Sequence, residues 1–417
     1  MSRAAIDQGE YDPNALTVEQ ALARIEQDVQ AVDGTERLAL REALGRVLAS
    51  DVHASFDVPI HTNSAMDGYA VRADDLPAQE PRKLHVVGES FAGHPYRGRL
   101  EPGECVRIMT GAVLPEGADT VLMQEHVEAQ ADHIVVAPGH KPGDNVRHAG
   151  EELHRGDRVL ACGRRLNAAD LGLLASLGIS EVDVLRRPIV AFFSTGDELK
   201  SVGQPLSEGQ IYDSNRYTLY AMLQRLNVQI IDMGVVGDAP ADVEHAFRLA
   251  AQQADVVITT GGVSVGAADY IKQTLERLGR VGFWKIAMKP GRPLAFGELG
   301  RALFFGLPGN PVSVMATFAL FARVAILKLS GERTTPPLRL RATTLDRLKK
   351  RPGRTDFQRG ILRQEEDGRL VVGTTGLQGS HVLSSMSRAN CFIVIPRDAG
   401  DVEIGSEVEI IPFDGVL

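Results

Sequence analysis

Cysteine is scarce in this chain of 417 residues, which contains only Cys105, Cys162 and Cys391. The number is odd and no C-x-x-C pair occurs, so we expect neither a disulfide framework nor a zinc site made of thiolates. The eleven histidines include no H-x-x-x-H pair, so zinc binding by histidine has no supporting pattern either. A reducing cytoplasm fits this composition.

Long apolar runs and an excess of positive charge are also lacking. Residues 1–15 contain no apolar signal region, and the most apolar helix candidate, 316–329, is interrupted by Arg323 and Lys328. We therefore expect neither export nor a membrane span. The formal net charge is −9, so no overall field would gather nucleic acid or an anionic membrane. A site for an anionic ligand must then be locally basic.

Changes of residue pattern along the chain predict an α/β multidomain protein. One long stretch alternates strand-like and helix-like segments, which is the order of a doubly wound parallel sheet. Other stretches contain short β-type runs or spaced apolar residues typical of helices. The predicted units are a tail (1–15), a discontinuous helical linker domain (16–54 and 153–186), a β-rich insertion lobe (55–152), the doubly wound domain (187–332) and a C-terminal small β barrel or sandwich (333–417).

Capping residues mark several of the expected helices. Thr17, with Gln20 close behind it, predicts the start of a helical opening over residues 17–51. Asn167 and Gly178 predict the start and the stop of a later helix. Asp213 is interpreted as an N-cap rather than a ligand contact.

A glycine-rich turn at residues 261–266 follows an apolar strand pattern. Such a turn offers backbone N–H groups to an anion. It lacks the lysine of a P-loop and the spacing of a dinucleotide fingerprint, but Gly262, Ser264 and Gly266 match the G-x-S-x-G elbow of hydrolases. A hydrolase would need a later histidine, and the only one is His381, in another predicted domain.

Ligands of doubly wound sheets bind beyond the carboxyl ends of the strands, where several cations are expected here. Lys285, Lys289 and Arg292 would neutralise an anion through charge-assisted hydrogen bonds. Pro311 at a first helical position leaves helix N–H groups to face that anion, with Ser313 as a further donor. Phosphate chemistry is the interpretation that these residue types favour.

Three carboxylates, Glu198, Asp238 and Asp269, follow three different strands. Carboxylates that converge among phosphates imply a divalent cation between them. We expect Mg²⁺, with Zn²⁺ as the alternative because oxygen ligands alone do not decide the metal. Two residues also have structural interpretations. Asp197 could be a turn or cap residue, and Lys285 could be an edge residue with its amine in water.

Six motifs stand in one order: NSAMDGYA at 63–70, RIMTGA at 107–112, STGDEL at 194–199, TGGVSVG at 260–266, KPG at 289–291 and LPGNPVS at 307–313. Together they resemble the MoeA family of molybdopterin molybdenumtransferases, whose eukaryotic relative is the E domain of gephyrin. The resemblance spans residues 17–413. It implies the last step of molybdenum cofactor synthesis, in which adenylylated molybdopterin and molybdate are bound, AMP is released and molybdenum is placed on the dithiolene sulfurs.

The resemblance also implies an elongated homodimer of four-domain subunits with a shared active cleft, and a molybdopterin adenylyltransferase as a partner. Nucleic acid and membranes are not expected partners. The implied catalytic residues are Asp67 and Thr110, which would reach in from the other subunit, with Glu198, Asp238, Asp269, Lys285 and Lys289. Glu198, Asp238 and Asp269 would hold the metal. The implied substrate-binding residues are Ser194, Gly261, Gly262, Ser264, Gly266, Pro290, Arg292, Pro308, Gly309, Asn310, Ser313, Arg359 and Ser380.

One departure from the family pattern is Arg292, which stands where lysine is common. Arginine keeps the positive charge, so phosphate binding should survive while the hydrogen-bond geometry changes. A scaffold that binds partners through its β lobes is a third reading. The repulsion among clustered carboxylates argues against a purely structural role.

Overall fold

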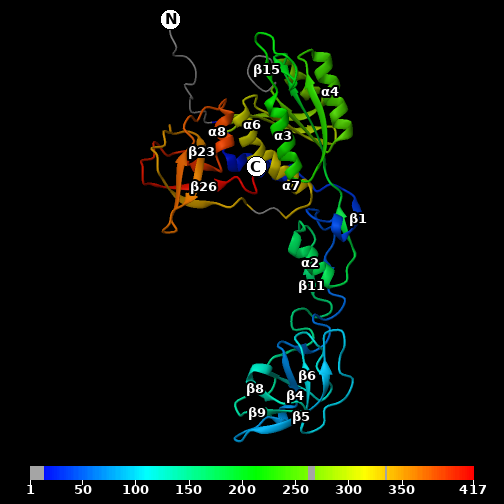
Figure 1. Ribbon diagram of the computed structural model, residues 1–417. Helices are drawn as coiled ribbons and strands as arrows, with labels where there is room; N and C mark the ends of the chain where they lie inside the picture. Colours follow the sequence, from blue (N-terminus) through cyan, green and yellow to red (C-terminus); the bar gives the residue numbers. More distant parts are fainter. Residues whose placement is uncertain (1–13, 262–267, 334–335) are drawn as a thin grey trace.

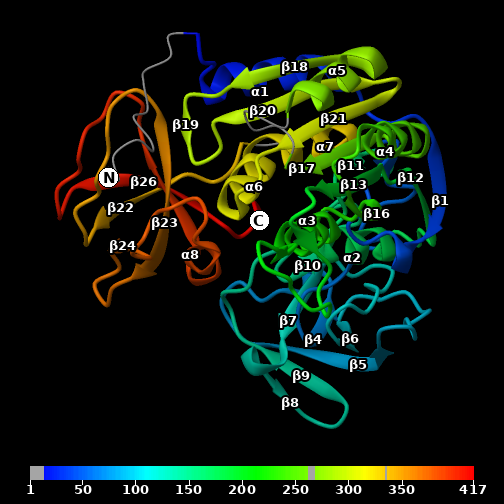
Figure 2. The ribbon, with the colours of Figure 1, turned by 90° about the horizontal axis from the view of Figure 1, so that it is seen from above.

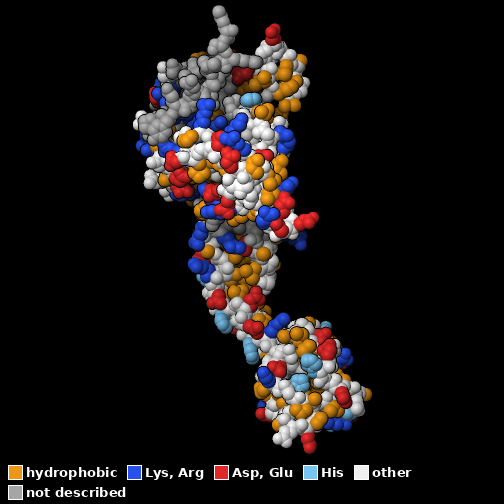
Figure 3. Space-filling view, turned by 90° about the vertical axis from the view of Figure 1, so that its left-hand side faces the viewer, with side chains coloured by type: hydrophobic (Ala, Val, Ile, Leu, Met, Phe, Trp, Pro, Cys, Tyr) orange, Lys and Arg blue, Asp and Glu red, His pale blue; other side chains and the backbone are white. Residues whose placement is uncertain are grey.

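The computed structural model describes residues 14–261, 268–333 and 336–417. The chain is elongated, with a β lobe at one end and two domains side by side at the other (Figure 1). A narrow waist joins the lobe to the rest, as the space-filling view shows (Figure 3). This arrangement is the predicted fold class, an α/β multidomain chain with a small C-terminal β barrel.

The β lobe is a six-stranded sheet in the order β7-β4-β6-β5-β9-β8. Side chains that alternate along the strands bury one face around Leu84, Cys105, Leu122 and Ile134. The strands are β4 (Gly68–Val71), β5 (Arg82–Ser90), β6 (Glu104–Ile108), β7 (Thr120–Met123), β8 (Val127–Ala129) and β9 (His133–Val136).

The waist contains more strand than the sequence predicted. The helical opening expected over 17–51 is reduced to α1 (Val18–Asp28), which begins with the predicted Thr17 cap. Leu38 then lies in β1 (Thr35–Ala39), paired with β12 (Glu181–Leu185). Apolar residues two positions apart fit the period of a strand and not that of a helix, which explains the difference.

Three further elements belong to the waist. Strand β2 (Val52–His53) pairs with β11 (Arg158–Leu160), and α2 (Ala168–Ser176) begins at the predicted Asn167 cap. Helix α1 does not pack in the waist, because its buried residues join the core of the α/β domain.

The α/β domain has the strand order β16-β13-β17-β21-β20-β18. Strands β16, β13, β17 and β21 pair in parallel, whereas β20 pairs antiparallel with both β21 and β18, which corrects the expectation of a parallel sheet at this edge. Only Gly300 and Arg301 separate β20 from β21, and a connection this short can only make a hairpin. The strands are β13 (Ile189–Thr195), β16 (Gln229–Val236), β17 (Val256–Thr260), β18 (Gly279–Lys285), β20 (Pro293–Leu299) and β21 (Ala302–Leu307).

Helices cover both faces of this sheet (Figure 2). Along β13, Val190 and Phe192 face one core while Ala191 and Phe193 face the other. Helices α3 (Ser214–Arg225), α6 (Pro311–Thr317) and α7 (Arg323–Leu329) cover the first face, and α4 (Pro240–Gln253) and α5 (Ala268–Leu278) the second. Pro311–Leu329 is long and apolar enough to cross a membrane, and 78% of an 18-residue window within it is buried inside the structure.

The C-terminal domain is a small closed barrel. Its strand order is β19-β23-β24-β22-β26-β25, and the further pairing of β23 with β25 closes it. Strand β19 (Met288–Lys289) comes from the α/β domain and pairs with β23, so the two domains are joined by backbone hydrogen bonds. The remaining elements are β22 (Leu340–Thr344), β23 (Thr355–Gln364), β24 (Leu370–Thr374), β25 (Cys391–Ile395), β26 (Glu407–Pro412) and α8 (Leu383–Arg388).

Candidate active site between the α/β domain and the barrel

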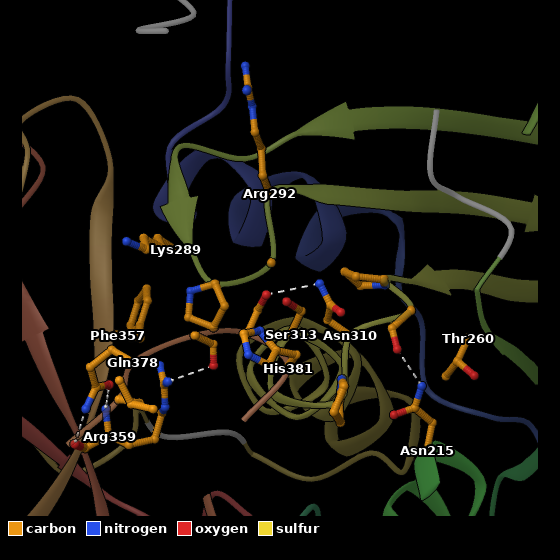
Figure 4. Close-up of a pocket in the computed structure, with 18 of the residues that line it drawn as sticks. Asn215, Thr260, Lys289, Arg292, Asn310, Ser313, Phe357, Arg359, Gln378 and His381 are labelled. Atoms are coloured by element: carbon orange, nitrogen blue, oxygen red, sulfur yellow. Dashed lines mark hydrogen bonds between the residues drawn. The ribbon is translucent and has the colours of Figure 1, made fainter. Parts of the chain in front are cut away.

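A cavity of about 1220 Å³ lies where the carboxyl ends of the parallel strands meet the barrel. Its α/β wall comes from the turns after β13, β17 and β21 and from the start of α3 (Figure 4). Its other wall comes from β23 and from the loop between β24 and α8. The position agrees with the rule that such sheets bind ligands at their strand ends.

Many of the predicted site residues line this cavity. They are Glu198, Gly261, Lys289, Pro290, Arg292, Pro308, Gly309, Asn310, Ser313, Arg359 and Ser380. Arg292 lines it, although its side chain extends away from Asn310 and Ser313 (Figure 4). Gly262, Ser264 and Gly266 lie outside the described residues, and so does the side chain of Asp269 in α5.

Three other predicted residues lie apart from the cavity lining. Ser194 is buried beneath it, where its Oγ accepts a hydrogen bond of 3.0 Å from the Thr260 hydroxyl. Lys285 ends β18, and its carbonyl oxygen accepts from Leu16 N at 2.9 Å. The third is Asp238, which lies outside the lining and whose side chain accepts a hydrogen bond from Asp197 N.

Asp197 and Asp238 cap one another. Asp238 N donates to Asp197 Oδ1 at 3.1 Å, and Asp197 N donates to Asp238 Oδ2 at 3.3 Å. Glu198 lies nearby, because β13 and β16 are neighbours in the sheet. Within the described part of the chain no three metal-binding side chains converge. Glu198 and Asp238 supply oxygen ligands of the kind that Mg²⁺ prefers, so these two residues fit the expected ion.

Hydrogen bonds hold the turn before α6 against both neighbouring elements. Asn215 Nδ2 donates to the Gly309 carbonyl at 2.8 Å, and Asn310 Nδ2 donates to Ser380 Oγ at 3.0 Å. Val312 N, which the sequence offered to an anion, donates to the Ser380 carbonyl at 3.1 Å instead. The helix terminus is therefore used to dock the barrel as well as to line the cavity.

Arg359 is the buried cation of the barrel wall, with 1% of its surface exposed. Its Nε donates to Ser385 Oγ and an Nη donates to the Gly379 carbonyl, both at 3.0 Å. Gln378 accepts from Arg359 N and donates to the Arg359 carbonyl, at 2.8 and 3.1 Å. Burial lowers the pKa of Arg359 to about 10, so it stays charged at neutral pH. The Arg359 guanidinium is therefore held in one orientation by the protein itself.

The cavity lining is basic, in contrast to the chain as a whole. Six cations line it, namely Lys289, Arg292, Arg347, Lys349, Arg354 and Arg359, against three carboxylates, Glu198, Asp213 and Asp356. Asp213 caps α3, as expected, by accepting from Arg216 N at 3.1 Å. The lining therefore carries the local positive charge that an anionic ligand requires in a chain of net charge −9.

Asp67 and Thr110 form a pair within the β lobe. The backbone N and the hydroxyl of Thr110 both donate to Asp67 Oδ1 at 2.7 Å, and these bonds lower the pKa of Asp67. The pair lies where β4 begins and β6 ends, at the opposite end of the molecule from the cavity (Figure 1). One chain therefore does not bring this pair to its own cavity.

Three family models cover most of the chain. The MoeA N-terminal region (domain I and II) matches residues 16–178, a probable molybdopterin binding domain matches 191–328, and the MoeA C-terminal region (domain IV) matches 341–413. The chain belongs to the MoeA family. This confirms the resemblance that the six motifs carried.

Individual relatives agree with the MoeA assignment. The molybdopterin molybdenumtransferase of Haemophilus influenzae is 47% identical over 96% of this chain and 100% of its own length. Gephyrin of Dictyostelium discoideum is 31% identical over 95% of this chain and 62% of gephyrin. The crystal structure of the molybdopterin biosynthesis MoeA protein from Pyrococcus horikoshii has a TM-score of 0.84 at 31% identity, covering 95% of this chain and 100% of that one.

Sequence reasoning missed part of the barrel wall of this MoeA chain. Arg347, Lys349, Arg354 and Asp356 all line the cavity but belong to none of the six motifs. The basic run at 347–354 was a signal that could have pointed to them. His381 also lines the cavity, as does Gly261, the one described residue of the glycine-rich turn.

Proposed function

We propose that this chain is a molybdopterin molybdenumtransferase, which inserts molybdenum from molybdate into adenylylated molybdopterin and releases AMP. The observation that carries the proposal is the basic cavity at the strand ends, since both substrates are anions. Its volume of about 1220 Å³ exceeds that of most sites for one small molecule and suits two substrates. The relatives named as molybdenumtransferases support the same activity.

The chain's own residues would bind and orient the two anions. Lys289 on β19 and Arg359 on β23, two paired strands, supply positive charge to the cavity lining. Ser313 and Ser380 add neutral donors to the same lining. Gly261 has a positive φ of 83° and no side chain, so a phosphate can approach the backbone there. Positioning and charge carry this chemistry, and no covalent nucleophile is required.

A divalent cation would be held by Glu198 and Asp238, with Asp269 as the third predicted ligand. When bound, it would neutralise charge on the phosphoanhydride. Mg²⁺ suits this oxygen-only set, and Zn²⁺ is the alternative.

We infer that the working unit is a homodimer with a shared cleft. Asp67 and Thr110 lie at the far end of one chain, so a partner subunit would have to present them at the cavity. We place the reaction in the cytoplasm, and a molybdopterin adenylyltransferase would supply the adenylylated substrate. Three free cysteines agree with a reducing compartment.

The test is release of AMP. The protein is incubated with adenylylated molybdopterin, molybdate and Mg²⁺, and AMP is followed by chromatography. We expect release that needs both molybdate and the metal. Asp269→Asn should bind the pterin yet release little AMP, whereas Ser264→Ala, which removes one neutral substrate contact, should lower AMP release much less. The hydrolase hypothesis would be favoured if the wild type released AMP without molybdate and Ser264→Ala released none.

A further inference from the structure

Asp356 is a buried carboxyl group inside the basic lining of the cavity. It lies near the start of β23, with 5% of its surface exposed, and β19 places Lys289 opposite it in the paired register. Its Oδ2 accepts a long hydrogen bond, of 3.4 Å, from Gln358 Nε2. The proposed chemistry gives this carboxyl no task.

Charged groups face Asp356 from each neighbouring element. Lys289 belongs to β19, Lys350 and Arg354 to the loop before β23, and Arg359 to β23 itself. The Lys350 amine is held by three backbone carbonyls, at 3.1 to 3.2 Å. Asp398, beyond β25, is an exposed carboxylate that faces Lys350. Asp356 is thus a buried negative charge among four cations.

Burial raises the pKa of Asp356, and the neighbouring cations, Lys289 foremost, oppose this rise. An oxyanion that enters the cavity would engage the three of these cations that line it, Lys289, Arg354 and Arg359, and would add a second negative charge beside the carboxyl group. Like charges in a site of low dielectric disfavour the charged form of both. The binding of an anion and the protonation of Asp356 are therefore coupled, and each strengthens the other.

We propose that Asp356 takes up a proton when molybdate binds in the basic part of the cavity. The identity of the anion rests on the proposed function, while the coupling rests on the position of the carboxyl group. Molybdate then meets a neutral side chain instead of a negative one. The charged carboxylate partly balances the neighbouring cations when the site is empty, and its protonation allows a dianion to bind.

Calorimetric titration of the full-length protein with molybdate tests this, in pairs of buffers that differ in ionisation enthalpy. We expect the wild type to take up as much as one proton per molybdate, at pH values between the pKa of Asp356 in the empty cavity and its higher pKa in the complex. Affinity should rise as the pH falls, by up to about tenfold per pH unit where uptake is complete. In Asp356→Asn the uptake and the pH dependence should vanish. At the alkaline end this variant should bind more tightly than the wild type, whereas a purely structural role would weaken binding at every pH.

Three further variants keep the result decisive. Asp398→Asn removes the exposed carboxylate near Lys350 and should retain the uptake, as should His381→Gln, which removes the cavity histidine. Asp356→Glu keeps a titrating group and should retain it even if Asp356→Asn fails to fold. Molybdate that binds without proton uptake, or uptake that survives in Asp356→Asn, overturns the inference and leaves the proposed function standing. Absence of molybdate binding counts against the proposed function itself.

Discussion

At the scale of single residues, Arg359 shows how the cavity fixes a charge in place. Five N–H groups in a planar fork let one side chain bind two acceptors, the Ser385 hydroxyl and the Gly379 carbonyl. Burial of the guanidinium is tolerated because these partners, together with Asp356 nearby, compensate for the lost water.

Arg359→Lys should therefore lower both stability and molybdate affinity. A lysine ammonium keeps the charge but cannot hold both acceptors in the same geometry, so we expect a loss of about 1–3 kcal/mol in unfolding free energy. Urea unfolding and molybdate titration measure the two effects. Arg354→Lys, in a half-buried arginine on the same wall, is the matched control and should leave stability nearly unchanged. Equal stability of Arg359→Lys and wild type would contradict the argument.

Gly261 is a second position where one atom decides the local structure. It has φ of 83°, and a Cβ built there would lie 2.7 Å from the Thr195 carbonyl oxygen. Gly300 has φ of 60° but no atom within 4 Å of such a Cβ. Both alanine variants carry the cost of a left-handed backbone, about 1–2 kcal/mol.

Gly261→Ala should lose more stability than Gly300→Ala, because only the first meets a backbone oxygen. It should also reduce AMP release strongly, since it shifts the turn that lines the cavity. Thermal unfolding of the two variants and AMP assays of both check this. Similar losses in the two would show that backbone strain alone explains them.

At the scale of elements, one ion pair connects the waist to the α/β sheet. Arg186, just after β12, binds Asp255, just before β17, through two bonds of 2.7 and 2.8 Å. Asp255 also accepts from Ile189 N, at the start of β13, at 2.8 Å. Burial alone would raise the pKa of Asp255, but these bonds outweigh it and hold the pKa below its usual range.

Asp255→Asn should therefore destabilise the protein at neutral pH, by about 1–3 kcal/mol, and much less in acid. Because the folded-state pKa is depressed, the contribution is complete above the unfolded value of about 3.9 and is lost as the pH falls through the folded value. Unfolding temperatures of wild type and variant, measured from neutral to acid pH, should converge. Asp183→Asn breaks the exposed pair with Arg37 and should have little effect at any pH.

Elements with a local signal could be predicted from the sequence, and those set by pairing could not. The Thr17 and Asn167 caps and the alternation through the α/β domain were visible because neighbouring residues encode them. Strand β1 was mistaken for helix because its partner lies far along the chain. The antiparallel β20 was missed although the two-residue connection at Gly300 was readable.

The candidate site divides in the same way. Gly261, Pro308 and Asn310 belong to turns that follow strands β17 and β21, so the fold class alone predicts their meeting. Arg354 and Asp356 reach the cavity only because strand β23 of the barrel pairs with β19. This pairing involves only two residues of β19, and no pattern in the sequence predicts it. Their contribution follows from tertiary structure.

At the scale of the whole molecule, the distance between the β lobe and the cavity predicts complementation between subunits. Lys289→Ala damages the cavity, and Asp67→Asn damages the lobe. In a dimer with one chain of each variant, one cleft would contain both substituted residues and the other cleft neither, as the symmetry of a shared site requires. Random mixing of the two variants, each inactive alone, should restore about a quarter of wild-type AMP release. Mixtures without activity would contradict a cleft shared between subunits.

The pairing of β19 with β23 has a mechanical consequence. Lys289 and Asp356 stand opposite each other on strands from two domains, and Thr355 N donates to the Ala287 carbonyl at 2.8 Å beside them. Separating the two domains at this edge of the cavity would have to break the backbone hydrogen bonds between β19 and β23. The paired strands therefore limit how far the two domains can separate at this edge of the cavity.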